Sequence, residues 1–190
     1  MRRVIVQQFV TLDGVMQAPG DPREFEGGGW QRPYMCDDQL TYIIEQAYEV
    51  EALLLGRKTY QGFAAAWPSM TGMRGLADRM NTMPKFVASR SLKQVEWNST
   101  LLSGDIGEEV ANLKQEPGRD LLVVGSGILV QTLIKYNLVD EYRIWVHPVV
   151  LGRGERLFRE GSEKLTLSLI DSKVTSTGAL VLTYRTVSNS

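Results

Sequence analysis

The sequence predicts an α/β protein, with a three-layer α/β/α architecture, a mostly parallel central sheet and an antiparallel β-hairpin near the C-terminus. Short apolar segments typical of buried strands alternate with segments whose apolar residues follow helical spacing. Near the end of the chain, two runs of alternating polar and apolar residues flank a Ser-Thr-Gly turn. Hydrophobic residues make up 43% and charged residues 23% of the 190 residues, as in globular proteins.

The N-terminal part predicts a strand, a long loop, a helix and a second strand. Residues 4–12 are β-branched and apolar and run into an Asp-Gly turn. Residues 15–33 are rich in Gly and Pro, and a loop of this length is a candidate lid. Helical spacing over 41–48 predicts a helix, and the wholly apolar run 52–55 predicts a strand buried on both faces.

The same alternation continues through the middle of the chain. Helices are predicted at 59–66, 76–80 and 106–115, and strands at 85–88 and 121–124. Strands that alternate with helices in this way favour a parallel sheet covered on both faces.

The C-terminal part predicts one more helix and three strands. The helix covers 128–136 and the next strand 141–146, and a hairpin joins strands at 165–174 and 179–187. Without an internal repeat or linker, we expect residues 1–190 to form one domain.

Charge and cysteine content exclude several classes of function. The formal net charge of −1 and the lack of a basic stripe argue against binding to nucleic acid or to a membrane surface. One cysteine, Cys36, cannot form an internal disulfide, and no signal peptide precedes the first strand, so we expect a cytoplasmic protein. With one Cys and one His, we expect no zinc-type metal site, and a structural role for His147.

Gly56, Arg57, Lys58 and Thr59 follow a buried strand and open a helix. Free backbone N–H groups at a helix start attract anions, and the two cations suit phosphate oxygens. The segment is therefore either a phosphate site or a plain strand end with two solvated cations.

Two other strand ends carry groups of the same kind. Gly125, Ser126 and Gly127 lie between a strand and a helix, where they form either a pyrophosphate cradle or a structural tight turn. Ser89 and Arg90 follow a third strand with a hydroxyl and a guanidinium group. Because ligands of open α/β sheets bind at the carboxyl ends of strands, one dinucleotide with a 2′-phosphate explains all three segments.

Candidate catalytic residues are acidic. Asp13 follows the first strand, where it either faces a cleft or is part of a turn. Asp37 and Asp38 precede the helix at 41–48 and either cap it or project into the cleft. Trp30 at the end of the loop either stacks on a planar ring or packs the loop down. Gly152 and Arg153 belong to a segment that is either a solvated loop or a pocket rim.

These segments, in this order, resemble the dihydrofolate reductase-like superfamily over nearly the whole chain, and especially the branch of the RibD C-terminal reductase domain. Five stretches carry the resemblance, and they are Thr11-Leu12-Asp13-Gly14, Leu55-Gly56-Arg57-Lys58-Thr59-Tyr60, Lys85-Phe86-Val87-Ala88-Ser89-Arg90, Val124-Gly125-Ser126-Gly127, and Leu138-Val139-Asp140-Glu141 with the later run from His147 to Gly154. The last stretch is typical of the RibD-like branch and is not a feature of true dihydrofolate reductases.

The resemblance implies a central sheet of about eight strands and binding of NADPH. It implies that Arg57, Ser89 and Arg90 surround the 2′-phosphate. It also implies that Lys58, Thr59 and the residues Gly125, Ser126, Gly127, Ile128 and Leu129 lie along the pyrophosphate. A homodimer, formed through 141–146 and the terminal hairpin, is a further expectation from the resemblance.

The implied activity is transfer of hydride from NADPH to a C=N or C=O group of a small heterocycle or ribosylamine. The closest analogy is 5-amino-6-(5-phosphoribosylamino)uracil reductase of riboflavin biosynthesis, with a proton from Asp13, Asp37 or an ordered water. Substrate-binding candidates are Trp30, Asp38, Gly152 and Arg153. A true dihydrofolate reductase is one alternative, although Met35 stands where bacterial enzymes of that type place an acid. A catalytically inactive NADPH-binding sensor or interaction module is another.

Overall fold

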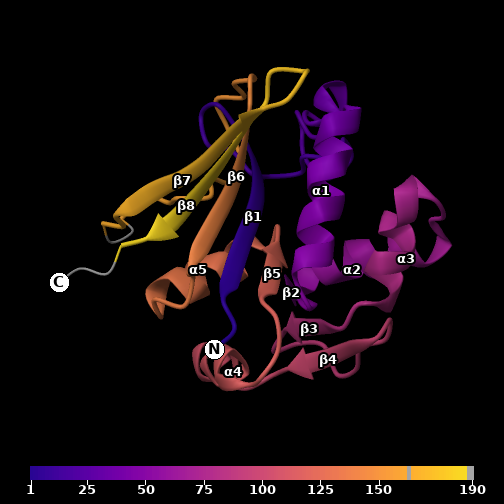
Figure 1. Ribbon diagram of the computed structural model, residues 1–190, viewed down its shortest axis with the longest axis vertical. Helices are drawn as coiled ribbons and strands as arrows, with labels where there is room; N and C mark the ends of the chain where they lie inside the picture. Colours follow the sequence, from indigo (N-terminus) through magenta and orange to yellow (C-terminus); the bar gives the residue numbers. More distant parts are fainter. Residues whose placement is uncertain (162–163, 188–190) are drawn as a thin grey trace.

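The computed structural model describes residues 1–161 and 164–187. Within them, eight strands form one sheet in the order β4-β3-β2-β5-β1-β6-β8-β7 (Figure 1). The strands from β4 to β6 in this order are parallel, and β8 is antiparallel to both β6 and β7. The predicted mostly parallel sheet with a terminal antiparallel hairpin is thus confirmed. The strands are β1 Val4–Thr11, β2 Ala52–Gly56, β3 Lys85–Ala88, β4 Ser99–Leu102, β5 Leu121–Val124, β6 Glu141–His147, β7 Leu167–Val174 and β8 Leu180–Thr186.

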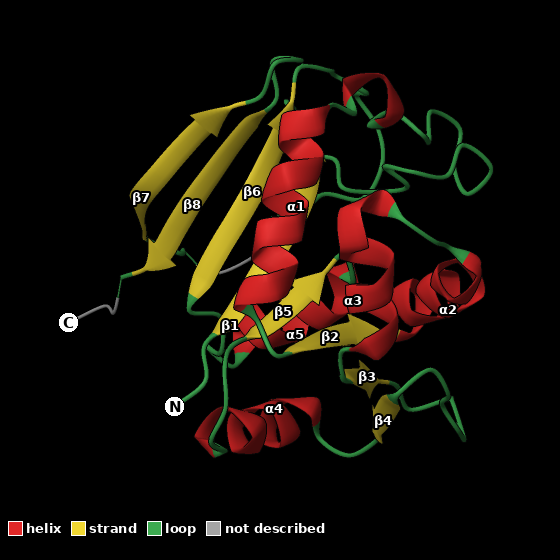
Figure 2. Ribbon diagram, turned by 45° about the vertical axis from the view of Figure 1, so that its right-hand side comes forward, coloured by secondary structure: helices red, strands yellow, loops and turns green. Residues whose placement is uncertain are grey.

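Helices cover both faces of the sheet (Figure 2). Apolar residues of α1, α2 and α3 pack in one buried cluster, and those of α4 and α5 pack in a second cluster on the opposite face. This arrangement confirms the three layers. The helices are α1 Asp37–Glu49, α2 Arg57–Ala66, α3 Leu76–Thr82, α4 Ile106–Gln115 and α5 Gly127–Lys135, with short 3-10 helices at Arg32–Tyr34, Trp67–Ser69 and Met73–Gly75.

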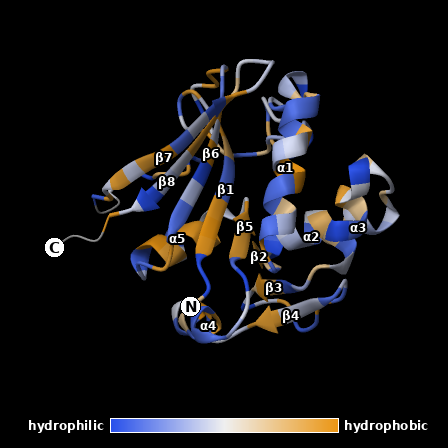
Figure 3. Cartoon of the chain, viewed as in Figure 1, coloured by the Kyte–Doolittle hydropathy of each residue, from blue (hydrophilic) through white to orange (hydrophobic). Residues whose placement is uncertain are grey.

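The core follows from the pleat of the strands, which sends successive side chains to opposite faces. Val4 and Val6 of β1 face α4 and α5, whereas Ile5 faces the cluster of α1 to α3. The central strands β2 and β5 are buried on both faces, which explains their unbroken apolar sequences (Figure 3). Within the described residues, no helix has the length and apolar character needed to cross a bilayer.

The two largest differences from the sequence prediction concern β4 and the start of α1. Strand β4, Ser99–Leu102, was not predicted, because its four residues begin with two polar ones and it is held as an edge strand by pairing with β3. Helix α1 begins at Asp37 instead of at residue 41, because Cys36 has the extended backbone of an N-cap and two acidic residues fill the first turn.

Because of the strand register, the strands do not end at the same level at the carboxyl edge of the sheet. Strand β1 pairs with β5 only from Val4 to Gln7, but with β6 from Ile5 to Thr11. The last residues of β1 therefore extend beyond the end of β5, where α5 begins. The carboxyl ends of β3, β2, β5 and β1 meet at this edge, as expected for a ligand site in an open α/β sheet.

Candidate functional site

The two strand-to-helix junctions that contain glycine, at residues 56–59 and 125–127, lie against each other. The Oγ atom of Ser126, after β5, accepts the backbone N–H of Gly56 at 2.8 Å, and it lies 3.0 Å from Oγ1 of Thr59 in α2. The start of α2 and the start of α5 are thus joined by one hydroxyl group. The N-terminal backbone donors of both helices are brought to one place.

Small residues make this approach feasible. A Cβ atom on Gly56 would lie 3.2 Å from Cβ of Ser126, and one on Gly125 would lie 3.2 Å from Oγ1 of Thr59. Gly125 and Ser126 both have left-handed backbone conformations, with φ of 59° and 65°. A side chain at either glycine would therefore push the two junctions apart.

The first turn of α5 has one exposed and one buried apolar residue. Ile128 is 73% exposed, whereas Leu129 is buried in the cluster beneath the helix. A Cβ atom on Gly127 would lie 3.2 Å from Sδ of Met16 and 3.9 Å from Oε2 of Glu155. Met16 and Glu155 therefore border the α5 N-terminus, and sequence reasoning did not identify them because they come from two distant loops.

The predicted cationic residues flank the junctions. Arg57 and Lys58 are the first residues of α2, both are exposed, and neither forms an ion pair with another described residue. Gly56 pairs with Ala88 in β3, so Ser89 and Arg90 emerge on the adjacent strand. Arg90 is exposed, but the buried Ser89 hydroxyl accepts the N–H groups of the turn that follows it. Arg57, Ser89 and Gly125 thus follow three neighbouring strands.

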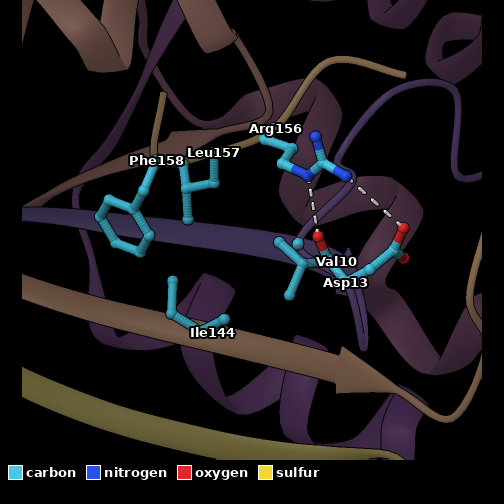
Figure 4. Close-up of a pocket in the computed structure, with 7 residues that line it drawn as sticks. Val10, Asp13, Ile144, Arg156, Leu157 and Phe158 are labelled. Atoms are coloured by element: carbon cyan, nitrogen blue, oxygen red, sulfur yellow. Dashed lines mark hydrogen bonds and ion pairs between the residues drawn. The ribbon is translucent and has the colours of Figure 1, made fainter. Parts of the chain in front are cut away.

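Asp13 holds a loop. One carboxylate oxygen accepts the Thr11 hydroxyl at 2.6 Å and the other accepts the Gly152 N–H at 2.8 Å, and the Leu151 N–H is also bound. The Thr11 hydroxyl, followed by these backbone donors, keeps the pKa of Asp13 below its ordinary value. Arg156 donates to the backbone carbonyl of Asp13 (Figure 4).

The neighbouring segments close a small cavity on the α5 side of the sheet. Val15 and Arg156 form an antiparallel bridge, and the N–H of Met16 donates to the carbonyl of Glu155. The cavity holds about 180 Å³ and is lined mainly by apolar side chains (Figure 4). It lies between β1, β6 and residues 156–158, beside Asp13 and not at the two glycine junctions.

The two acidic residues at the start of α1, Asp37 and Asp38, have different surroundings. Asp37 is exposed. The carboxylate of Asp38 accepts the N–H and the hydroxyl of Ser176 in the β7–β8 turn. Hydrogen bonds from Cys36, first, and from Ser176 lower the pKa of Asp38 to about 2. In this structure Asp38 joins α1 to the hairpin.

The loop residues also have partners. Trp30 is buried, donates from Nε1 to the carbonyl of Gln17 at 2.9 Å and packs edge-on against His147. Gly152 and Arg153 are exposed, and Arg153 forms an ion pair with Glu26 of the long loop at 2.8 Å. The loop at 152–153 is therefore tied to both Asp13 and the candidate lid.

Comparisons with known proteins point to one family. A family model described as the RibD C-terminal domain matches residues 2–181. The uncharacterized protein YyaP of Bacillus subtilis is 28% identical over 186 residues, which is 96% of this chain and 94% of that protein.

Solved structures share the fold. A putative riboflavin biosynthesis protein from Shewanella is 24% identical, with a TM-score of 0.75 over 97% of this chain and 99% of that one. Dihydrofolate reductase from Enterococcus faecalis, in complex with NADP(H) and RAB-propyl, is 14% identical, with a TM-score of 0.64 over 97% and 96% of the two chains.

Proposed function

The chain belongs to the RibD C-terminal domain family, and on that premise we propose that it is an NADPH-dependent reductase of a small heterocycle or ribosylamine. Members of this fold include reductases, one of them with NADP(H) bound. The observation that carries the proposal is the contact between the α2 and α5 N-termini through Ser126.

The residues of this junction fit a pyrophosphate. Gly56 and Gly125 allow the two helix starts to approach each other closely, and the helix starts provide N–H donors and positive ends of dipoles. In the proposed complex, Thr59 and the residues from Gly125 to Leu129 line the pyrophosphate, and Lys58 adds positive charge.

The 2′-phosphate is assigned to the adjacent strands. Arg57 is exposed and unpaired among the described residues, and Arg90 emerges one strand away. Two guanidinium groups suit a phosphate monoester because each presents several donors in a plane. The Ser89 hydroxyl accepts the N–H groups of its own turn and the Ser89 N–H donates to the carbonyl of Leu102, so Ser89 orders the turn that carries Arg90.

The cofactor, when bound, supplies the hydride, and the protein orients the two rings and excludes water. The proposed substrate carries a C=N or C=O group, with 5-amino-6-(5-phosphoribosylamino)uracil reductase as the closest analogy, and Trp30, Asp38, Gly152 and Arg153 as proposed contacts. Asp13 at neutral pH is an ionised acceptor, which suits orientation. Asp37 or an ordered water remains as the proposed proton donor.

We extend the proposal to the oligomeric state of the protein and to its location in the cell. Strand β7 is exposed along nearly its whole length and carries Leu169, Ile170 and Val174 at the sheet edge (Figure 3). An edge strand with exposed apolar residues and, among the described residues, no neighbour on its outer side favours association, so we propose a homodimer that uses the hairpin, in the cytoplasm.

Tryptophan fluorescence during titration with NADPH and NADH tests the cofactor assignment. We expect NADPH to bind well before NADH, and Arg57→Ala to remove most of that difference. Arg185→Ala, an exposed arginine on β8, is the matched control. Equal affinity for both cofactors would reject the assignment of the 2′-phosphate.

Substrate screening separates the remaining candidates. Oxidation of NADPH with dihydrofolate would identify a true dihydrofolate reductase. Binding of NADPH without oxidation across pteridine, pyrimidine and imine compounds would identify a sensor or interaction module.

A further inference from the structure

Buried polar atoms without a partner gather on one side of the sheet. Among the described residues, seven buried side-chain nitrogen or oxygen atoms have no hydrogen-bond partner. Five of them belong to α1 or to the strand β6 that faces it, and they are Gln39 Nε2, Gln39 Oε1, Gln46 Oε1, Trp145 Nε1 and His147 Nε2. These atoms are the polar groups of this layer that ordered water or a ligand could bind.

His147 is a buried acceptor. Its Nδ1 atom lies 3.0 Å from the carbonyl oxygen of Trp145 and 3.3 Å from that of Val10. Both carbonyls accept, so Nδ1 carries the proton and Nε2 presents a lone pair. Burial lowers the pKa of His147, which keeps the ring neutral. Phe9, Trp30 and Tyr34 surround the ring edge-on, at centroid distances of 5.3 to 5.7 Å.

Gln39 lies on the stripe of α1 that faces β1 and β6. Further along this side of the helix, Tyr42 packs on Trp145, and Glu49 bonds Arg143 at 2.8 Å. The helix therefore runs toward the start of β6, and Gln39, one turn before Tyr42, lies toward the His147 end of the strand. Its side chain is 0% exposed, with both polar atoms unpartnered.

Buried polar groups without a hydrogen-bond partner destabilise the folded state. Each buried donor or acceptor left without a partner lowers the folding equilibrium constant by roughly fivefold to a hundredfold. A glutamine with two such atoms, toward the same end of the layer as an imidazole with a third, is therefore expected to meet either ordered water or a ligand.

The position of Gln39 and His147 favours a ligand that also reaches the proposed cofactor site. Thr11 of β1 pairs with His147 on one side, and Gln7, four residues earlier, pairs with Val124 at the end of β5 on the other. Between them lies Phe9, the one residue of β1 that keeps partial exposure. A planar ring that packs on Phe9 would have one edge toward the β5 end and the other toward Gln39 and His147.

We propose that Gln39 and His147 bind the neutral N–H and C=O edge of a planar heterocyclic substrate, an inference that rests on the reductase function proposed above. The Gln39 amide donates from Nε2 to the ring carbonyl and accepts a ring N–H at Oε1. His147 Nε2 accepts a further N–H. Trp30 and Tyr34 cover this end, so the loop that carries them moves aside on binding.

The choice of residue types predicts the charge of the substrate edge. Gln39 lies four residues after Met35, which precedes α1, and neither position carries an acid. An amide and a neutral imidazole pair with a lactam without any net charge, whereas a protonated diaminopyrimidine would bring a buried charge with no partner. The site therefore discriminates against the cation.

Calorimetric titration with two matched probes tests the proposal. The probes are 2-amino-6-methylpyrimidin-4-one, which has the lactam edge, and 2,4-diamino-6-methylpyrimidine, which has an amino group in place of the oxygen. We expect the intact protein to prefer the lactam by at least about tenfold, the effect of one or two lost hydrogen bonds.

Variants at Gln39 then test whether this residue causes the preference for the lactam probe. Gln39→Leu should lower lactam affinity about tenfold or more, and the nearly isosteric Gln39→Glu should reverse the preference. Gln46→Leu, on the same stripe two turns away, should leave both affinities unchanged. If Gln39→Leu does not fold, as judged by thermal unfolding, Gln39→Glu still decides the question.

Unchanged probe affinities in both Gln39 variants would overturn the proposal and leave ordered water as the partner. Failure of the intact protein to bind the lactam at millimolar concentration would overturn it as well. A parallel titration with NADPH keeps the two proposals separate. A protein that binds the lactam through Gln39 but does not bind NADPH refutes only the cofactor assignment, and normal NADPH binding with no Gln39 effect refutes only this inference.

Discussion

The hydroxyl of Ser126 lies 3.0 Å from the hydroxyl of Thr59 and also accepts the N–H of Gly56, which is 70 residues earlier in the chain. One side chain therefore sets the spacing between two helix N-termini. Because an anion bound there depends on donors from both helices, a small change in this spacing should affect stability and cofactor binding together.

Ser126→Ala removes this connection. The Gly56 N–H loses its acceptor and Thr59 loses its neighbour, so we expect the free energy of unfolding to fall by about 1 to 3 kcal/mol. We also expect NADPH affinity to fall several-fold. Urea unfolding and fluorescence titration measure the two effects. Ser69→Ala, at an exposed serine in a short 3-10 helix, is the control. Equal losses in both variants would contradict the assigned role.

The exposed edge strand β7 predicts how association can be broken. Val174, 67% exposed, and Ile170, 44% exposed, lie on a strand without an outer neighbour among the described residues. A charge at either position disfavours an apolar contact, so Ile170→Asp and Val174→Asp should convert a dimer to a monomer in sedimentation experiments. NADPH binding should persist. Thr100→Asp, on the opposite edge strand β4, should remain dimeric, and a monomeric wild-type protein would refute the assembly proposal.

Lys85 predicts a pH dependence of stability. Burial, and to a smaller extent the charge of Arg79, lower the pKa of Lys85 to about 8. Its ammonium group donates to the carbonyl of Met83 at 2.8 Å and lies 3.9 Å from the ring centre of Trp97. The folded state binds the proton less tightly than the unfolded state, whose pKa is near 10.5. Stability contributed by this group therefore rises between about pH 8 and pH 10.5.

Thermal unfolding of the wild type and of Lys85→Met over this pH range measures the effect. We expect the wild-type melting temperature to gain on that of the variant as the pH rises, because methionine carries no charge to lose. A constant difference between the two proteins across the range would show that the pKa of Lys85 is not depressed.

Much of the fold is encoded locally and was predictable. Val-, Leu- and Ile-rich runs such as 52–55 and 121–124 are central strands because only a strand covered on both faces buries four apolar residues in succession. The Gly-Ser-Gly segment after β5 was predicted as a turn before a helix, and α5 begins at its last glycine. Strand β4 was missed because its pairing with β3, and not its own sequence, holds it in the sheet.

The site was predictable only in part. The three anion-binding segments follow strands, so parallel topology alone brings them to one edge. The sequence contains no local sign that Asp13 would bind the backbone of Gly152, or that Gln39 would be buried without a hydrogen-bond partner, because these features depend on tertiary contacts. A glutamine on the sheet-facing stripe of α1 is the one available signal, since such positions are usually apolar.

Asp13 gives the last prediction, which separates a positioning role from a proton-donating one. Its carboxylate accepts from Thr11, Leu151 and Gly152, and its pKa is lowered, so at neutral pH it has no proton to give. Asp13→Ala should cost about 2 to 3 kcal/mol of unfolding free energy and release the loop that contains Arg153 and Arg156. Trypsin cuts after arginine, so cleavage after these two residues, followed by mass spectrometry, should accelerate in the variant.

Asp13→Asn separates the two roles because the amide keeps one acceptor oxygen but cannot release an acidic proton. For a positioning residue, this variant should lie between Asp13→Ala and the wild type in both stability and trypsin resistance. Asp21→Ala, an exposed carboxylate in the same connection that pairs with Arg23, should behave like the wild type. If the native resistance to trypsin and to urea survives in Asp13→Ala, the hydrogen bonds to residues 151 and 152 do not hold the loop, and the carboxylate becomes available for a direct part in the reaction.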